Sequence, residues 1–291
     1  MTTRSMTLKP KLIPATLIPA TLSLALAFVP GCKKDSETQN PDSAVVDDAP
    51  ADTTPPEAQA ALPEQDPDPA EIAALYARYL KGDYEVVVAE AEELRAGLTA
   101  DTQVRAHALA SAIQALAAIE GVPENGQEAA EQALASGERL ADPEVLELAH
   151  IAHGAYLVRV HEAAKGQVEL EAAVALGGPK VALAHLMLAE AHLNQAFGTG
   201  DQDMKIVDAS KFDDARSSYE SALAAGDGLL QASAHEGLAA IAKYKGEKAA
   251  VCEHAQQADT LYSAGGATDY IREVPSLLAK DARCTDFKKA E

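Results

Sequence analysis

Tryptophan is absent from this chain of 291 residues, and aromatic residues make up only 4% of it. Alternating runs of Val, Ile and Thr, which predict half-buried β-strands, are also nearly absent. Long stretches instead consist of Ala, Leu, Glu, Gln, Lys and Arg, the residues that are least costly in a helix. The composition therefore predicts an all-α fold, and it leaves only Tyr and Phe for stacking on a sugar.

Motifs of common catalytic sites are incomplete. His161-Glu162 begins like the zinc-binding helix of metalloproteases, but the second histidine would have to stand where Lys165 stands, and His235-Glu236 fails in the same way. Gly121 to Gly126 has the glycine spacing of a phosphate-binding loop, but Gln127 follows where Lys is needed. The chain also lacks the GxSxG motif of serine hydrolases. We therefore expect no catalytic activity.

Histidines offer little for a metal site. His150 and His153 lie three residues apart in a predicted helix, and His161 lies near the same face. A zinc site would need a further ligand, and none stands out in the sequence. Helix packing or surface exposure is the simpler role, so we expect no metal and no cofactor.

Positive charge is scarce, with 24 Lys and Arg against 45 Asp and Glu, for a formal net charge of −21. Such a protein repels the phosphates of nucleic acids and of anionic membranes. We therefore expect no nucleic-acid partner, and membrane association only through an anchor. The acidity either maintains solubility or attracts a basic partner surface.

The first 31 residues are typical of a secretory signal peptide. A start with Arg4, Lys9 and Lys11 and no acid precedes the apolar run LIPATLIPATLSLALAFV, from Leu12 to Val29. Val29-Pro30-Gly31-Cys32 then resembles the lipobox of bacterial lipoproteins. The resemblance implies that Cys32 becomes the first mature residue and carries a diacylglycerol thioether and an N-acyl chain such as palmitate. The alternative is an ordinary secretory signal with an incidental Cys.

Anchoring by two or more acyl chains is stable, whereas one is marginal. Lys33 follows the cysteine, and in enterobacterial lipoproteins Asp there marks retention in the inner membrane. By that analogy we expect a lipid-anchored protein of the cell envelope, at the outer rather than the inner membrane. Residues 32–69 are expected to form a disordered acidic tether, since this Pro-, Asp- and Ala-rich stretch has no aromatic residue and few groups to bury.

Residues 70–291 are expected to form a domain of repeated helix pairs. Similar turn chemistry recurs in Ala74–Leu94, Leu146–Lys180, Lys211–Asp227 and Gly237–Ala258. We expect five pairs whose first helices begin near residues 70, 102, 144, 180 and 228, and a capping helix over Thr268–Ala282. Longer spacings indicate insertions at Gly121–Gly126 and between Phe197 and Lys211. Small residues are expected where helices touch: Ala189, Ala215, Ala222, Gly237 and Ala239.

This pattern resembles the tetratricopeptide repeat (TPR), and the resemblance implies an α-α superhelix whose first helices line a concave groove. A generic Ala-rich helical bundle is the alternative. Aligning the first helices places eight residues in the groove: Tyr76, Tyr79, Arg159, Glu190, Asn194, Glu236, Lys243 and Tyr244. Such grooves hold an extended peptide or a helix. The alternative for each residue is an ordinary solvated position.

Cys252 and Cys284 remain as a pair if Cys32 is lipidated. An exported protein meets an oxidising compartment, so we expect a disulfide between them. Two separate buried thiols are the alternative, and the absence of a CxxC motif speaks against a redox role.

Two functions fit these features. The first is a membrane-anchored scaffold or adaptor of the cell envelope that binds protein or peptide partners through the groove. The second is a ligand-handling accessory lipoprotein of a periplasmic solute transport system, which would require a pocket within the helix stack. A pull-down would favour the first and a co-purifying small molecule the second.

Overall fold

The computed structural model describes residues 64–99, 102–121, 123–197 and 205–290. Within them the chain forms α-helices and one short 3-10 helix, with no strand beyond an isolated bridge between Phe197 and Ile206. The predicted all-α fold is therefore confirmed. The helices are α1 (Ala70–Lys81), α2 (Tyr84–Gly97), α3 (Val104–Ala118), η1 (Pro123–Gly126), α4 (Gln127–Leu140), α5 (Pro143–Arg159), α6 (Ala163–Leu176), α7 (Val181–Ala196), α8 (Lys211–Ala225), α9 (Gly228–Lys245), α10 (Lys248–Gly265) and α11 (Asp269–Asp281).

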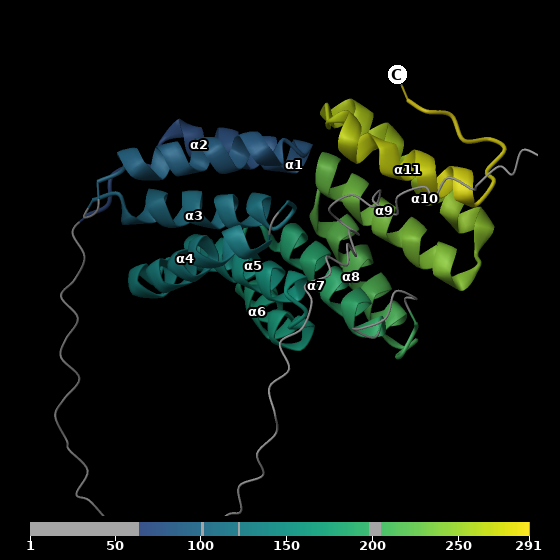
Figure 1. The fold of residues 1–291 in the computed structure, drawn as a ribbon, viewed down its shortest axis with the longest axis horizontal. Coiled ribbons are helices and arrows are strands. Elements are labelled where there is room, and N and C mark those ends of the chain that lie inside the picture. The colour runs from purple at the N-terminus through teal and green to yellow at the C-terminus, as the bar shows by residue number, and fades with distance from the viewer. Residues whose placement is uncertain (1–63, 100–101, 122, 198–204, 291) are drawn as a thin grey trace, which may run out of the picture.

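The helices form five successive pairs, α1–α2 to α9–α10, followed by α11 (Figure 1). Helices pack within each pair, and the first helix of each pair also contacts the first helix of the next. The observed first helices begin at residues 70, 104, 143, 181 and 228. The expected helical-repeat layout is thus confirmed to within two residues, and α11 occupies the place of the expected capping helix. The expected insertions are η1 and the segment between α7 and α8.

Close helix contacts depend on small side chains, as expected. Ala189, Ala215, Ala222 and Ala239 are fully buried. Gly237 lies under the ring of Tyr219, where an added Cβ would be 2.1 Å from Cζ. A crossing that the sequence did not reveal joins α5 to α6 at Gly154 and Gly166. A Cβ on Gly166 would lie 2.7 Å from the Gly154 carbonyl oxygen.

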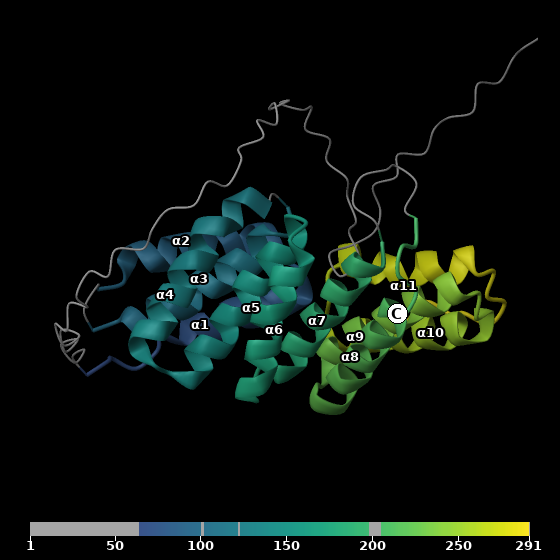
Figure 2. The same cartoon turned by 90° about the horizontal axis from the view of Figure 1, so that it is seen from below.

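The first and last parts of the array meet, so that the stack curves back on itself (Figures 1 and 2). The Thr268 amide, just before α11, donates to the Lys81 carbonyl at the end of α1, at 2.9 Å. Gly82 adopts a left-handed conformation with φ of 85° and lies against Ile271 of α11. Helix α1 also contacts α9. The concave side of the array is therefore enclosed between its N-terminal and C-terminal pairs.

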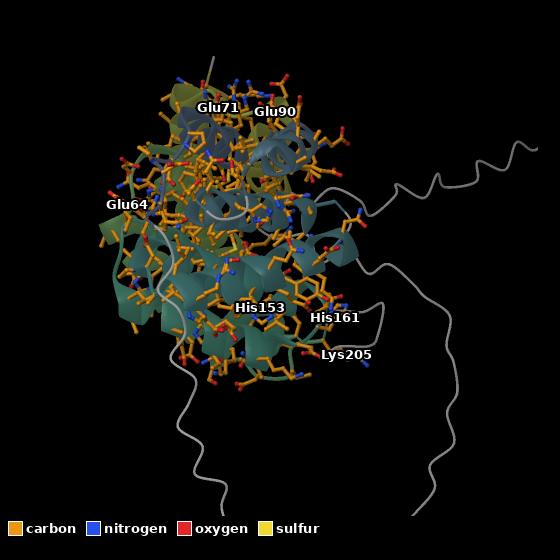
Figure 3. The ribbon with its side chains drawn as sticks, turned by 90° about the vertical axis from the view of Figure 1, so that its left-hand side faces the viewer. Glu64, Glu71, Glu90, His153, His161 and Lys205 are labelled. Carbon is orange, nitrogen blue, oxygen red and sulfur yellow. A yellow bond between two sulfur atoms is a disulfide. The ribbon has the colours of Figure 1, made fainter. Side chains whose placement is uncertain are left out.

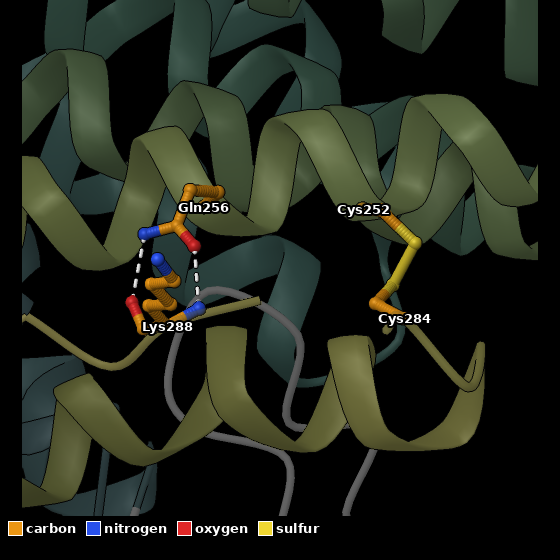
Figure 4. The surroundings of a disulfide bond; sticks show 4 residues. All are labelled: Cys252, Gln256, Cys284 and Lys288. Carbon is orange, nitrogen blue, oxygen red and sulfur yellow. Dashed lines mark hydrogen bonds between the residues drawn. A yellow bond between two sulfur atoms is a disulfide. The ribbon is translucent and has the colours of Figure 1, made fainter. Parts of the chain in front are cut away.

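The C-terminal segment after α11 is fastened to α10 (Figure 4). Cys252 and Cys284 form a disulfide with their Cα atoms 5.6 Å apart, which confirms the expected pairing. The Gln256 side chain donates to the Lys288 carbonyl at 2.9 Å and accepts from the Lys288 amide at 2.8 Å. The Asp259 carboxylate accepts from the Ala290 amide at 2.5 Å. Side chains of α10 thus hold the backbone of the segment that follows α11.

Several predicted features lie outside the described residues: the signal peptide 1–31, the lipid attachment at Cys32, most of the 32–69 tether, and residues 198–204 of the long insertion. Among the helices of the described ranges, none has the length and apolarity needed to cross a bilayer.

Candidate functional site

Seven residues from different helix pairs come together where the array closes, and we call them the interior cluster: Tyr79, Tyr84, Glu120, Arg159, Glu190, Glu236 and Tyr262. Acidic residues are rarely buried unless paired. This cluster contains three carboxyl groups and one guanidinium. Its side-chain chemistry therefore departs from ordinary core packing.

Glu120 is positioned by the end of α3. That helix is buried on nearly all sides, so the acidic residue two positions beyond it also enters the interior. Its side chain is only 6% exposed, and its Oε2 atom is buried without a hydrogen-bond partner. Burial raises the pKa of Glu120 to about 8, although the nearby Arg159 lowers it. An isolated Glu120 carboxyl therefore tends to hold a proton near neutral pH.

Arg159, at the end of α5, connects two parts of the cluster. Its Nε donates to the Ile119 carbonyl at 3.3 Å, and its terminal nitrogen lies 3.9 Å from Glu120 Oε2. Burial and the neighbouring Glu120 and Glu236 raise the pKa of Glu190 on α7, which Arg159 partly offsets. The positive charge of Arg159 thus favours the ionised form of two carboxyl groups, Glu120 and Glu190.

A small cavity of about 30 Å³, partly open to solvent, lies beside the cluster. Four leucines, Met187 and Ile271 form its apolar wall, and Ser233 and the three cluster tyrosines contribute hydroxyl groups and ring faces. Glu120 is the one charged residue among those lining it. The Tyr262 hydroxyl donates to Glu236 Oε2 at 3.0 Å, and it lies 3.1 Å from Ser233 Oγ. The volume is enough for about two water molecules.

The predicted groove residues lie in different environments in the structure. Tyr79, Arg159, Glu190 and Glu236 join the interior cluster, where Tyr79 is 5% and Glu236 0% exposed, rather than lining an open trough. Tyr76 lies beside Tyr79, with ring centroids 6.3 Å apart. Their contact with a partner stays a prediction.

The remaining three groove residues lie elsewhere. Asn194 donates to the Glu190 carbonyl at 3.1 Å, Lys243 pairs with Asp281 at 2.7 Å, and Tyr244 packs on Phe197 with ring centroids 5.0 Å apart. These contacts fasten helix ends and the segment after α7, so the three residues do not belong to the interior cluster.

No family model, no curated protein and no solved structure matches this chain.

Both histidines of α5 lie beside one carboxylate on α6. His150 Nδ1 lies 2.7 Å from Glu169 Oε2, and His153 Nδ1 lies 3.5 Å from Oε1 of the same carboxylate. His161 is exposed beyond the end of α5, in the same part of the molecule as His153 (Figure 3). Across the ranges that the structure describes, no group of three or more His, Cys, Asp or Glu is arranged to hold a metal ion.

Tyr84, Glu120 and Tyr262 belong to the cluster, but the sequence interpretation missed them. A signal for Glu120 exists in the apolar run VRAHALASAIQALAAIE, which has no polar face wide enough for solvent, so that the acid at its end is carried inward. For Tyr262 no signal exists within its own helix, because its place beside Tyr84 and Glu120 depends on closure of the array, although its hydrogen bonds to Ser233 and Glu236 lie within the last pair.

Proposed function

We propose that this protein is a non-catalytic, lipid-anchored binding protein of the bacterial cell envelope that holds a small ligand in its interior cavity. The observation that carries the proposal is a cavity with an apolar and aromatic wall and a single charged group, Glu120, whose buried oxygen lacks a hydrogen bond. Ligand sites are typically apolar concavities with few, well-placed polar groups. A buried carboxyl without a hydrogen-bond partner destabilises the folded protein. A ligand that donates a hydrogen bond to it would offset that cost.

The location is proposed from the N-terminal sequence. Lipidation of Cys32 and a long acidic tether would hold the helical domain at a distance from the outer membrane, accessible to solutes. The helix-pair layout supports the resemblance to TPR lipoproteins that accompany solute transporters. Growth of cells with labelled palmitate tests the anchor, because the label should enter the wild-type protein and be lost in Cys32→Ser.

Ligand retention tests the function. The full-length protein, isolated from envelopes in mild detergent and examined by native mass spectrometry, should carry a small molecule. Ser233→Met would fill the cavity beside Tyr262 and should abolish the added mass. Ser217→Met is the matched control, since Ser217 is exposed on α8. A wild-type protein without added mass, or the same mass in both variants, would contradict the proposal.

The adaptor remains a second proposal, and the way α10 holds residues 284–290 favours it. Gln256 makes two hydrogen bonds to the backbone of Lys288, which is how a groove binds an extended peptide without reading its side chains. A partner would compete with this segment. Removing residues 285–291 should then increase crosslinking of an envelope protein to α10, and Gln256→Ala in the shortened chain should reverse the increase. An unchanged crosslinking pattern would rule out this face.

A further inference from the structure

We propose that the cavity binds a small primary alkylammonium ion, with its nitrogen donating to Glu120 Oε2 and its alkyl part lying among the tyrosine rings. This inference rests on the proposed ligand-binding function and specifies the class of ligand. It adds a residue, Glu120, that the sequence does not single out.

The residues around the cavity include a hydrogen-bond acceptor without a donor, on Glu120. Glu120 Oε2 is buried, has no hydrogen bond, and its side chain lines the cavity. Its closest basic group, Arg159, lies 3.9 Å away, which is too long for a hydrogen bond, and Arg159 Nε is directed to the Ile119 carbonyl. An ammonium group has three donors and fits a carboxylate that needs one.

The surroundings of Glu120 favour added positive charge. The titratable groups that interact with it are Tyr79 on α1, Tyr84 on α2, Arg159 on α5 and Glu190 on α7. Tyr262 on α10 lines the same cavity, and Glu236 on α9 interacts with Glu190 and Tyr262. One cation stands among three carboxyl groups. Glu120 also follows the C-terminal end of α3, where the helix dipole presents its negative end. An anionic ligand would be repelled by the same groups.

The wall of the cavity distinguishes an organic from an inorganic cation. Tyr79 and Tyr84 lie with ring centroids 5.8 Å apart, and aromatic faces attract ammonium groups. The chain already contains such a pair, since Lys180 Nζ lies 3.9 Å from the centre of the Tyr76 ring. Alkali and alkaline-earth ions need several oxygen ligands, whereas most of this lining is leucine, methionine and isoleucine. About 30 Å³ limits the enclosed part to two or three non-hydrogen atoms.

Ligand-observed NMR titration of the full-length protein with ethylammonium chloride tests the proposal. Ethanol, acetate and potassium chloride serve as the neutral, anionic and inorganic probes. We expect saturable binding of ethylammonium alone. Because the Glu120 pKa is about 8, the affinity should rise about tenfold from pH 7 to pH 9, where ethylammonium still carries its charge. Glu120→Gln should lower the affinity at pH 9 at least tenfold and remove the pH dependence, whereas Glu93→Gln, exposed on α2, should change neither.

Tyr84 gives an independent variant in case Glu120→Gln does not fold. Tyr84→Leu should weaken binding, whereas Tyr84→Phe, which keeps the ring, should retain it. Equal binding of ethanol or potassium, or full affinity in Glu120→Gln, would overturn the proposal. If native mass spectrometry finds a neutral or anionic compound that Ser233→Met removes, the binding function stands and the alkylammonium inference fails. Absence of both bound compound and ethylammonium binding would refute both.

Discussion

Replacing Glu120 by glutamine should stabilise the unliganded protein, and by an amount that depends on pH. Burial raises the pKa of this carboxyl from 4.5 to about 8. Each pH unit between these values costs the folded state about 1.4 kcal/mol, because the unfolded chain releases the proton and the folded chain keeps it. The full difference is therefore about 5 kcal/mol. This is a large fraction of a domain's usual stability of about 5–15 kcal/mol.

The raised pKa of Glu120 determines the direction in which stability changes with pH. Below pH 4.5 the carboxyl is protonated in both states, and the wild type and Glu120→Gln should have the same free energy of unfolding. As the pH rises through 8, the wild type loses stability and the variant does not, so the variant becomes the more stable by about 5 kcal/mol. Above pH 8 the difference should stay constant.

Histidines make the comparison with the variant necessary. Burial lowers the pKa of five of them, which makes the wild type more stable as the pH rises toward 6.5 and opposes the effect of Glu120. They are His107, His185, His192, His235 and His254. Their contribution cancels when Glu120→Gln is subtracted from the wild type. Glu93→Gln, on the exposed face of α2, should show no such pH-dependent difference.

Urea denaturation followed by circular dichroism at 222 nm measures this difference, since the chain is helical and has no Trp to report by fluorescence. The series should run from pH 4 to pH 9 in the absence of amines, because a bound cation would hide the effect. A difference between the two proteins that is independent of pH, or a variant that is the less stable at pH 8, would refute the reasoning. Glu120 would then be ionised and stabilised by Arg159 in the native protein.

Three further predictions concern the scaffold. Cys252→Ser with Cys284→Ser should lower the free energy of unfolding by about 4 kcal/mol, since the bond closes a loop across 32 positions, and the reduced wild type should show the same loss in urea titrations. Gly237→Ala should cost about 1–3 kcal/mol by forcing a methyl against Tyr219, whereas Gly97→Ala, with nothing within 4 Å, should stay within about 0.5 kcal/mol; equal effects would contradict this account. Gln256→Ala should accelerate amide exchange at Lys288, which Gln257→Ala should leave unchanged.

The helix pairs could be predicted from the sequence because their signals are local. Glycine ends α1 and α9 in a left-handed conformation at Gly82 and Gly246. Asp142 caps the start of α5 by accepting from the Glu144 and Val145 amides, and Pro143 occupies the first turn. These residues act within one or two turns of helix, so the pattern fixes the boundaries to within two residues without any knowledge of the tertiary structure.

The site could be predicted only in part, because it depends on how far the array curves. Alignment of the first helices predicted that Tyr79, Arg159, Glu190 and Glu236 share an inward side, and in the structure they belong to the interior cluster, while their contact with a partner stays a prediction. Whether that side is an open groove or an interior depends on small rotations between pairs that add up along the chain. The Thr268–Lys81 hydrogen bond joins residues 187 positions apart, and no local pattern predicts it.

Closure also explains why the acidic residues belong to a site and not to a solvated face. On an open array Glu190 and Glu236 would face water, and the pKa of Glu190 would not be raised by burial. Packing of α11 against Gly82 instead brings Ile271 to the cavity, where it meets Tyr262 of α10 and the residues of the first pair. The contact between α1 and α11 therefore has two effects. It contributes to the burial that destabilises ionised Glu120, and it encloses the cavity in which a ligand would bind. Any substitution that opens the contact between α1 and α11 should therefore reduce both the stability that Glu120→Gln gains at pH 8 and the affinity for an amine, so these two quantities must fall together.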